Sequence, residues 1–443
     1  MENRYDKYKD SGIAWIREIP EHWEVKRMKS IYNFGKGLNI TKADLVDKGI
    51  PVISYGQIHS KLNTGTCIKD SLIKYVPEIF FENNNTSLVK KGDIIFADTS
   101  EDLEGCGNCI YIDRDMLLYA GYHTIIAKNI STYINKYFSY LFQTDCWRTQ
   151  IRRTVNGVKL FSIPQRLLAS TDIITPSTQE QQSIATYLDQ KCSEIDELIT
   201  LQEEMITKLQ SYKQSVITEA VTKGLDKNVP LKDSGIEWIG EIPEHWICTV
   251  FKKFLSEPMQ YGANEAAEEC NYNDPRYIRI TDIKDDGTLR DDTFKSLPLE
   301  KAKEYMLTKG DLLFARSGAT VGETFLYKED YAACFAGYLI KARCNKNELL
   351  PNFIFYYTLS NAYQNWKNSI FIQSTIQNIG ADKYSVMPII APPLSEQQSI
   401  ANYLDQKCSE IDELISIKQQ KIEKLKDYKK SLIFECVTGK RKV

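Results

Sequence analysis

Few residues of this chain combine the types and the spacing that catalysis requires. Cys106 and Cys109 form a single CxxC pair, whereas a structural zinc site needs a second pair of ligands. The chain has 11 cysteines, an odd number, and only four histidines, which are His22, His59, His123 and His245. We therefore expect reduced thiols, no disulfide framework and no bound metal.

Two short motifs could suggest a catalytic site, but their sequence context does not support one. Asn273-Asp-Pro-Arg-Tyr277 approaches the Asn/Asp-Pro-Pro-Tyr signature of amino-methyltransferases, yet its second proline is absent and no glycine-rich cofactor loop follows a strand. Thr99-Ser-Glu-Asp102 places two acids in a turn, where a hydrogen-bonded loop is the simpler interpretation. The sequence also lacks a Walker loop, a serine elbow and an HExxH motif. It predicts a noncatalytic protein without a cofactor.

Basic and amide side chains gather at corresponding places in two segments of the chain. Such side chains bind phosphates and the edges of bases. A single residue of this kind is as often a solvated loop residue, so the correspondence between the segments supports the interpretation. The candidate DNA contacts of the first segment are Gln57, Lys61, Thr99, Ser100, Arg148, Arg152, Arg153, Asn156 and Lys159. Those of the second segment are Arg279, Thr281, Lys284, Arg316, Ser317, Thr320, Gln373, Thr375, Gln377 and Asn378.

The charge distribution leaves DNA binding open without establishing it. The formal net charge is −3, which does not suggest a nucleic-acid binder for the chain as a whole. Residues 24–178 hold 19 Lys and Arg against 15 Asp and Glu, and residues 247–394 hold 17 against 18. Residues 179–222 hold 3 against 8, so this segment favours a surface that faces water or protein.

Two internal repeats show how the chain organises these side chains. DSGIAWIREIPEHW, at 10–23, returns as DSGIEWIGEIPEHW at 233–246. EQQSIATYLDQKCSEIDELI, at 180–199, returns as EQQSIANYLDQKCSEIDELI at 396–415. The order is a short box, a variable segment and a repeated helix, and then all three again. Four of the six tryptophans lie in the boxes, where we expect them to pack the domain against helix ends, with direct contact to a partner protein as the alternative.

Each repeated segment has the pattern of a long helix. No proline interrupts about 44 residues, which would extend roughly 66 Å. Ser177 with Glu180 and Ser395 with Gln398 predict capping boxes. Gly224 and Gly439 predict the C-terminal ends of the two helices.

Apolar residues recur along both helices at spacings of three and four, which predicts one apolar face on each. We expect the two faces to pack on each other as an intramolecular antiparallel coiled coil. The alternative is that each helix docks on its neighbouring domain alone. The expected apolar positions include Ile184, Leu188, Ile195, Leu198, Tyr212, Val216 and Ile217 in the first helix and Ile400, Leu404, Ile411, Leu414, Tyr428, Leu432 and Ile433 in the second.

The two variable segments share a framework. The run from Lys90 to Ala97 matches the run from Thr308 to Ala315, and Ala120-Gly-Tyr122 is aligned with Ala336-Gly-Tyr338. β-rich runs broken by Gly, Asn and Asp predict two mixed α/β domains of one fold. No run approaches the roughly 18 apolar residues of a membrane helix, and the polar N-terminus has no apolar leader, so we expect a cytoplasmic protein.

Taken together, these motifs resemble the specificity (S) subunit of bacterial type I restriction-modification systems. The resemblance rests on the two boxes, on the repeated helix, and on KGDLLFARSGATVGETFLY (309–327) with its counterpart KGDIIFADTSED (91–102), and it extends over nearly the whole chain. It implies a mixed α/β fold in which two similar target-recognition domains are separated by a long antiparallel two-helix coiled coil with pseudo-twofold symmetry. The implied organisation is box 1–23, domain 24–178, helix 179–223, linker and second box 224–246, domain 247–394 and helix 395–443.

The resemblance also implies a function. Each domain would read one half of a split sequence in double-stranded DNA, and the helices would dock two methyltransferase (M) subunits, with restriction (R) subunits joining the complex. Catalysis would belong to those partners. Two other classes stay open from the residues alone, which are a self-contained DNA methyltransferase or nuclease and a coiled-coil scaffold that does not read DNA.

Overall fold

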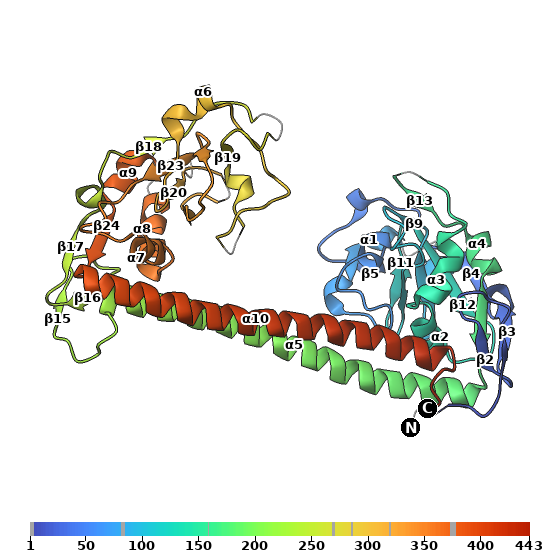
Figure 1. The fold of residues 1–443 in the computed structure, drawn as a ribbon. Helices are drawn as coiled ribbons and strands as arrows, with labels where there is room; N and C mark the ends of the chain where they lie inside the picture. The colour runs from blue at the N-terminus through green and yellow to red at the C-terminus, as the bar shows by residue number, and fades with distance from the viewer. Residues whose placement is uncertain are drawn as a thin grey trace. The chain divides into compact units, whose positions relative to one another are not determined.

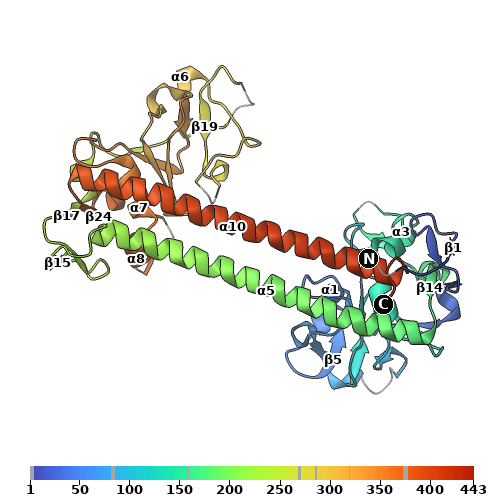
Figure 2. The same ribbon diagram turned by 60° about the horizontal axis from the view of Figure 1, so that its bottom comes forward.

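The computed structural model describes residues 4–80, 85–157, 159–267, 271–284, 287–318, 320–372 and 378–443. The chain divides into two compact units, Met1–Gln202 with Gln420–Val443, and Glu203–Gln419. Each unit therefore combines one globular domain with a part of each long helix. Figures 1 and 2 show these helices, α5 in green and α10 in red, running side by side.

The first unit contains two four-stranded sheets. One is antiparallel, with the strand order β10-β8-β12-β4. The other has the order β6-β5-β11-β7, in which β5 and β11 run parallel. The strands are β4 (Tyr32–Lys36), β5 (Ile50–Ile53), β6 (Lys74–Val76), β7 (Leu88–Val89), β8 (Ile94–Ala97), β10 (Cys109–Tyr111), β11 (Leu118–Ala120) and β12 (Thr124–Asn129).

Three strand pairs and four short helices complete this domain. The pair of β3 and β14 joins its beginning to its end, β1 pairs with β2 in the box, and β9 pairs with β13. The strands are β1 (Tyr8–Asp10), β2 (Glu18–Pro20), β3 (Glu24–Arg27), β9 (Thr99–Ser100), β13 (Phe161–Ser162) and β14 (Asp172–Thr175). The helices are α1 (Tyr55–Ile58), α2 (Asn135–Leu141), α3 (Asp145–Arg152) and α4 (Gln165–Ser170).

The second unit repeats the antiparallel sheet, while a parallel strand pair takes the place of the other four-stranded sheet. Its antiparallel sheet has the order β21-β20-β23-β18, β19 runs parallel to β22, β17 closes on β24, and β15 pairs with β16. The strands are β15 (Leu231–Asp233), β16 (Glu241–Pro243), β17 (Ile247–Val250), β18 (Gln260–Tyr261), β19 (Arg276–Ile278), β20 (Leu312–Ala315), β21 (Thr324–Leu326), β22 (Ala333–Phe335), β23 (Leu339–Ala342) and β24 (Pro388–Ala391). The short helices are α6 (Leu299–Ala302), α7 (Pro351–Thr358), α8 (Asn361–Ile372) and α9 (Ala381–Ser385).

The central strand of each domain follows directly from its sequence. β8 is Ile-Ile-Phe-Ala and β20 is Leu-Leu-Phe-Ala, and all four side chains of each strand are buried. A Lys-Gly-Asp turn precedes both strands, and its glycine has a positive φ of 96° at Gly92 and 102° at Gly310. Only glycine adopts such angles at little cost, so the turn fixes where each strand begins.

The long helices are α5 (Thr178–Lys223) and α10 (Leu394–Val437). Gly224 and Gly439 follow their last turns with φ of 79° and 71°, so both predicted C-terminal ends are confirmed. The capping box of Ser177 and Glu180 is also present, with the serine hydroxyl 2.7 Å from the carboxylate. The one predicted for Ser395 and Gln398 is wrong, because α10 already begins at Leu394 and Ser395 is its second residue. In the part of the chain that the structure describes, neither these nor the shorter helices are apolar and long enough to cross a membrane.

Within each unit the two helices pack antiparallel. In the first unit Lys429 Nζ lies 2.6 Å from Asp196 Oδ2, and in the second Lys213 Nζ lies 2.7 Å from Asp412 Oδ2. These pairs occupy equivalent positions of the two repeats. Buried side chains on both helices join the core of the adjoining domain, among them Ile184, Leu188, Leu432 and Ile433 in the first unit and Val216, Ile217, Ile400 and Leu404 in the second.

Part of the predicted apolar face does not pack in the core. Leu198 and Tyr212 of α5 are 44% and 57% exposed, and their counterparts Leu414 and Tyr428 of α10 are 46% and 51% exposed. The prediction was wrong for these four residues because spacings of three and four also fit a neighbouring stripe that faces outward. These four positions therefore place the same exposed apolar side chains on both long helices.

Each box packs at the start of one long helix. In the first unit Glu180 accepts hydrogen bonds from His22 Nε2 at 2.9 Å and from Trp23 Nε1 at 3.1 Å. In the second unit Glu396 accepts them from His245 at 2.7 Å and from Trp246 at 3.0 Å. Both of these tryptophan rings are fully buried, which agrees with the packing role expected from the sequence.

Candidate nucleic-acid interface

The residue that follows the central strand is held in the same way in both domains. In the first, Asp98 N donates to His123 O at 3.1 Å, and Ile163 N donates to Asp98 O at 2.7 Å. In the second, Arg316 N donates to Tyr338 O at 3.0 Å, and Ile379 N donates to Arg316 O at 2.9 Å. Asp98 and Arg316 are therefore equivalent positions, and so are His123 and Tyr338.

This equivalence corrects the alignment of the glycine motif. Gly121 N donates to Ile53 O at 2.7 Å, and its counterpart in the second domain is Ala336 N, which donates to Ile278 O at 3.0 Å. Gly121 thus corresponds to Ala336 and not to Gly337. Matching the Ala-Gly-Tyr letters put the second domain one residue out of register, because sequence similarity ignores the hydrogen bonds that define the turn.

The predicted polar clusters lie beside the ends of the central strands. β9, which contains Thr99 and Ser100, pairs with β13 two residues beyond Lys159. In the second domain Ser317 forms a β-bridge with Asn378. The structure thus brings the end of the first cluster, and Asn378 of the second, next to the segment that follows the central strand.

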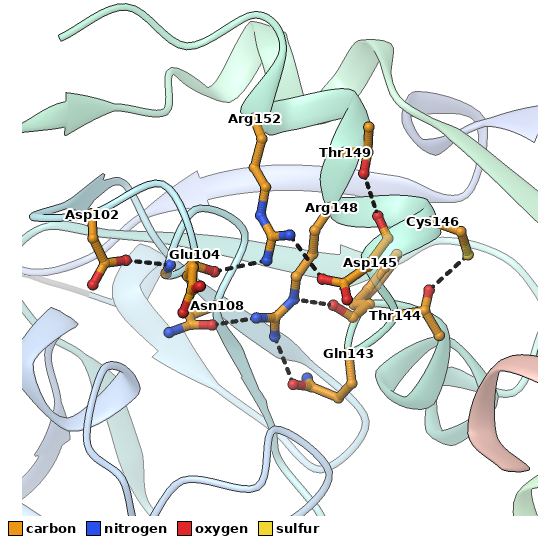
Figure 3. A network of polar contacts seen from close by, with 12 residues as sticks. Asp102, Glu104, Asn108, Gln143, Thr144, Asp145, Cys146, Arg148, Thr149 and Arg152 are labelled. Carbon is orange, nitrogen blue, oxygen red and sulfur yellow. Dashed lines mark hydrogen bonds and ion pairs between the residues drawn. The ribbon is translucent and has the colours of Figure 1, made fainter. Parts of the chain in front are cut away.

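Two of the predicted arginines in the first domain are held by the protein itself (Figure 3). Arg148 donates to Phe142 O at 2.8 Å, to Asn108 Oδ1 at 2.7 Å and to Gln143 Oε1 at 2.7 Å. Burial lowers the pKa of its guanidinium. Three of the N–H donors of Arg148 thus bond the protein itself, which stabilises the loop that contains Asn108.

Arg152 and Arg153 also make internal contacts. Arg152 forms an ion pair with Asp145 at 2.7 Å and donates to Glu104 O at 3.0 Å. Arg153 is exposed, and its guanidinium lies 5.1 Å from the ring centre of Trp15 in the first box. The ion pair of Arg152 does not favour direct readout of a base, whereas Arg153 keeps an exposed guanidinium.

The other candidates of the first domain divide into buried and exposed groups. Gln57 is half-buried and its Oε1 accepts from Ser54 N at 3.0 Å, while Ser100 is 1% exposed and donates to Asp102 O at 2.7 Å. Thr99 is half-buried, and its carbonyl contacts His59 Nε2 at 2.8 Å. Lys61, Asn156 and Lys159 are exposed.

In the second domain Arg279 is held internally and Arg316 is not. Arg279 forms a two-point ion pair with buried Asp282, at 2.7 and 3.1 Å. The Arg316 guanidinium lies 4.8 Å from the ring centre of Tyr261. The remaining described candidates are half-buried or exposed, namely Thr281, Lys284, Ser317, Thr320 and Asn378. Gln373, Thr375 and Gln377 lie outside the described residues.

The structure adds residues that sequence analysis did not name as candidate DNA contacts. His123 has a positive φ of 54°, and its Nδ1 lies 3.2 Å from Asp98 Oδ1. Tyr55 packs edge-on against both Tyr122 and His123. Tyr261 and Tyr338 are 42% and 65% exposed in the second domain. Tyr261 is the last residue of β18, and His123 and Tyr338 directly precede β12 and β23. Strand ends and the loops beyond them present side chains to ligands, so these positions were a usable signal.

The CxxC pair and the Thr99–Asp102 segment, which were considered as possible metal or catalytic sites, have structural roles. Burial raises the pKa of the Cys109 thiol to about 12, so it stays protonated. Asp102 Oδ1 accepts from Gly105 N at 2.6 Å, which makes the Thr99–Asp102 segment a hydrogen-bonded loop. Within the described ranges, no three side chains of His, Cys, Asp or Glu come together as metal ligands.

Comparison with known proteins identifies the chain. Residues 20–210 and 260–427 match the family described as the type I restriction modification DNA specificity domain. The chain belongs to this family. Its two matched segments contain the two globular domains, so one chain carries two DNA specificity domains. The resemblance drawn from the boxes and the repeated helices is therefore confirmed.

Curated relatives match over most of their length. The putative type I restriction enzyme MjaX specificity subunit of Methanocaldococcus jannaschii is 25% identical, over 97% of this chain and 96% of its own. The type I restriction enzyme EcoKI specificity subunit of Escherichia coli is 20% identical, over 88% of this chain and 82% of its own. Both relatives are named as specificity subunits of type I restriction enzymes.

Solved structures share the fold. One, reported under the complex assembly and conformational transition of the type I R-M system, covers 95% of this chain and 99% of its own, with a TM-score of 0.71 and 16% identity. The HsdS subunit from Thermoanaerobacter tengcongensis covers 95% and 98%, with a TM-score of 0.52 and 16% identity. The predicted mixed α/β fold, with two similar domains and a long helix pair, is confirmed.

Proposed function

We propose that each domain reads one half of a split target in double-stranded DNA, and that the helix pair docks two methyltransferase subunits. The observation that carries this proposal is the contrast at one position. The same backbone clamp holds Asp98 beside His123 in one domain and Arg316 beside Tyr338 in the other. A common frame that presents different hydrogen-bonding groups is what reading two different half-sites requires.

The identical repeats need a second explanation, because the fold uses only some of their residues. Gln181 and Gln397 are fully buried and accept from the backbone of Ile134 and Leu350 at 2.8 and 2.7 Å. Asp189 and Asp405 accept from the hydroxyls of Tyr140 and Tyr356 at 2.7 and 2.6 Å. These contacts account for the inward face of the repeats.

The outward face is repeated as well. Lys191 and Glu194 form an exposed pair at 2.6 Å, which Lys407 and Glu410 repeat at 2.8 Å. Leu198 is 44% exposed and Leu414 is 46% exposed. Identical exposed side chains at equivalent places form two equal docking surfaces, each suited to one copy of the same partner. We assign these surfaces to the methyltransferase subunits and infer that restriction subunits join through them.

Exposed or partly exposed side chains support the described candidates as DNA contacts, whereas Gln373, Thr375 and Gln377 are proposed from the sequence alone. We keep Lys61, Thr99, Asn156, Lys159, Thr281, Lys284, Arg316, Ser317, Thr320, Gln373, Thr375, Gln377 and Asn378 as contacts to phosphates or bases. We propose a supporting role for Gln57, Ser100, Arg148, Arg152 and Arg279, because each is buried or bonded to other residues of the protein, and we keep exposed Arg153 as a DNA contact. Work on chromosomal and incoming DNA would place the complex in the cytoplasm.

The test is to co-express the chain with the methyltransferase subunit from its own locus and to map methylated bases over the genome. We expect a split motif that is methylated only when this chain is present. Methylation that is unchanged on deletion of the chain would instead favour a scaffold without DNA readout. Methyl transfer by the purified chain alone would favour a self-contained enzyme.

A further inference from the structure

We propose that Arg316 reads a guanine in the second half-site, and that the first domain, which has a carboxylate at this place, reads different base chemistry. This inference rests on the proposed function and names the base pair that one position selects. It begins from the position already shown to be equivalent in the two domains. The argument has three steps, which concern the backbone, the guanidinium and the base.

The backbone around Arg316 is fixed on both sides. Its own N and O bond Tyr338 O and Ile379 N at 3.0 and 2.9 Å. The preceding Ala315 O accepts from Gly322 N at 2.9 Å and from the Tyr384 hydroxyl at 3.0 Å. A side chain that recognises a nucleobase needs a rigid backbone, because the orientation of its donors determines the specificity.

The guanidinium is held by an aromatic face. It lies 4.8 Å from the ring centre of Tyr261, within the range of a cation–π contact. Tyr261 is itself fixed, since its strand β18 pairs with β23 and its hydroxyl accepts from Ala381 N at 3.0 Å. A cation–π contact leaves the N–H groups of the guanidinium available for hydrogen bonds.

Arg316 also lacks the acidic partner that Arg279 and Arg343 have. Arg279 pairs with Asp282, and Arg343 pairs with Asp311 at 2.7 Å. Among the residues that the structure describes, Arg316 forms no ion pair. A guanidinium that contacts an aromatic ring and forms no ion pair is therefore available to an external acceptor.

Guanine is the base that matches this donor set. Its O6 and N7 are two adjacent acceptors in the major groove, and the arginine fork meets both at once. The equivalent Asp98 offers only acceptors, and its Oδ1 lies 3.2 Å from His123 Nδ1. Asp98 therefore repels O6 and N7, so the first half-site is read with other chemistry at the corresponding position.

The experiment maps methylated motifs in cells that hold the methyltransferase subunit and variants of the full chain. For Arg316→Ala we expect one G·C position of the second half-site to become degenerate, with discrimination falling on the order of 10- to 100-fold, while the first half-site stays unchanged. For Arg316→Gln we expect a shift of that position toward adenine, which glutamine can bond through N6 and N7. Arg290→Ala removes another exposed arginine of the same domain and should leave the motif intact.

Three outcomes would overturn the inference. An unchanged motif with uniformly weaker methylation for Arg316→Ala, restored by Arg316→Lys, would make Arg316 a phosphate contact. Degeneracy at an A·T pair, or in the first half-site, would assign the wrong base or the wrong domain. If Arg316→Ala abolishes methylation, the motif of the Arg316→Gln variant tests the inference instead. Retention of G at every position of the second half-site in that variant would reject the inference. Failure of the proposed function is distinct, because the unaltered chain would then direct no split motif.

Discussion

Glu180 joins the first box to the first long helix, and its ionisation is coupled to folding. Burial opposes its charge, but hydrogen bonds from His22, Ser177 and Trp23 outweigh burial and lower the pKa to about 2 from 4.5. A carboxylate with a depressed folded pKa stabilises the native state above its unfolded pKa, and this stability is lost as pH falls through the folded value. The contribution is therefore complete near neutral pH and declines between about pH 4.5 and 2.

Glu180→Gln should destabilise the first unit by on the order of 2 kcal/mol at pH 7, an amount that allows for the 25% exposure of the side chain. Hydrogen exchange of peptides covering 134–142 and 178–190 in denaturant measures this difference. The gap between the variant and the unaltered chain should narrow below about pH 4.5. A gap that stays constant down to pH 3 would reject the coupling, and Glu396→Gln in the second unit should leave these peptides unchanged.

The outward apolar residues of the long helices give a prediction at the scale of the element. Leu198→Asp should remove one bound methyltransferase subunit, and Leu414→Asp should remove the other. The double variant should bind neither subunit, because a charged residue in the core of a protein interface is strongly disfavoured. Native mass spectrometry counts the copies. Since both leucines are nearly half exposed, stability should change by less than about 1 kcal/mol.

Gln210→Asp is the matched control, because this exposed position has lysine, Lys426, in the other helix and is not part of the repeated surface. It should retain both copies. Loss of both copies from a single leucine variant would contradict two independent docking sites.

Helix length gives a second prediction. Four residues inserted after Gln202 and four after Gln419, where the helices pass between the units, preserve the Lys429–Asp196 and Lys213–Asp412 contacts within each unit. The insertion adds about 6 Å to each helix, which should lengthen the spacer between half-sites by about two base pairs. Mapping of methylated bases should show both half-sites unchanged. A spacer of unchanged length, with DNA binding intact, would show that helix length does not set the distance between the half-sites.

The sequence predicted the secondary-structure elements better than it predicted the exposure and the contacts of individual side chains. Both helix ends followed from Gly224 and Gly439, and the buried central strands from four-residue apolar runs. Periodicity could not separate the packed face from the outward face at Leu198 and Leu414. Nor could it show that Arg148 is held by Asn108, which lies 40 residues away in the chain. Such partners are set by the sheet register, which single-sequence patterns leave open.

At the scale of the whole molecule, the same arrangement of box and long helix occurs twice and supports two different DNA specificity domains. Each domain begins and ends at the same strand pair, β3 with β14 in the first and β17 with β24 in the second. Each also meets its helix through the same contacts, from the backbone of Ile134 or Leu350 to the buried glutamine of the repeat. A domain should therefore fit either frame.

The most direct test of this account is a chain in which residues 24–175 replace residues 247–391, co-expressed with the methyltransferase subunit. Methylated bases are then mapped over the genome. The account predicts a motif in which a second copy of the first half-site takes the place of the second half-site. A motif that keeps its original second half-site would contradict the assignment of DNA reading to the two domains.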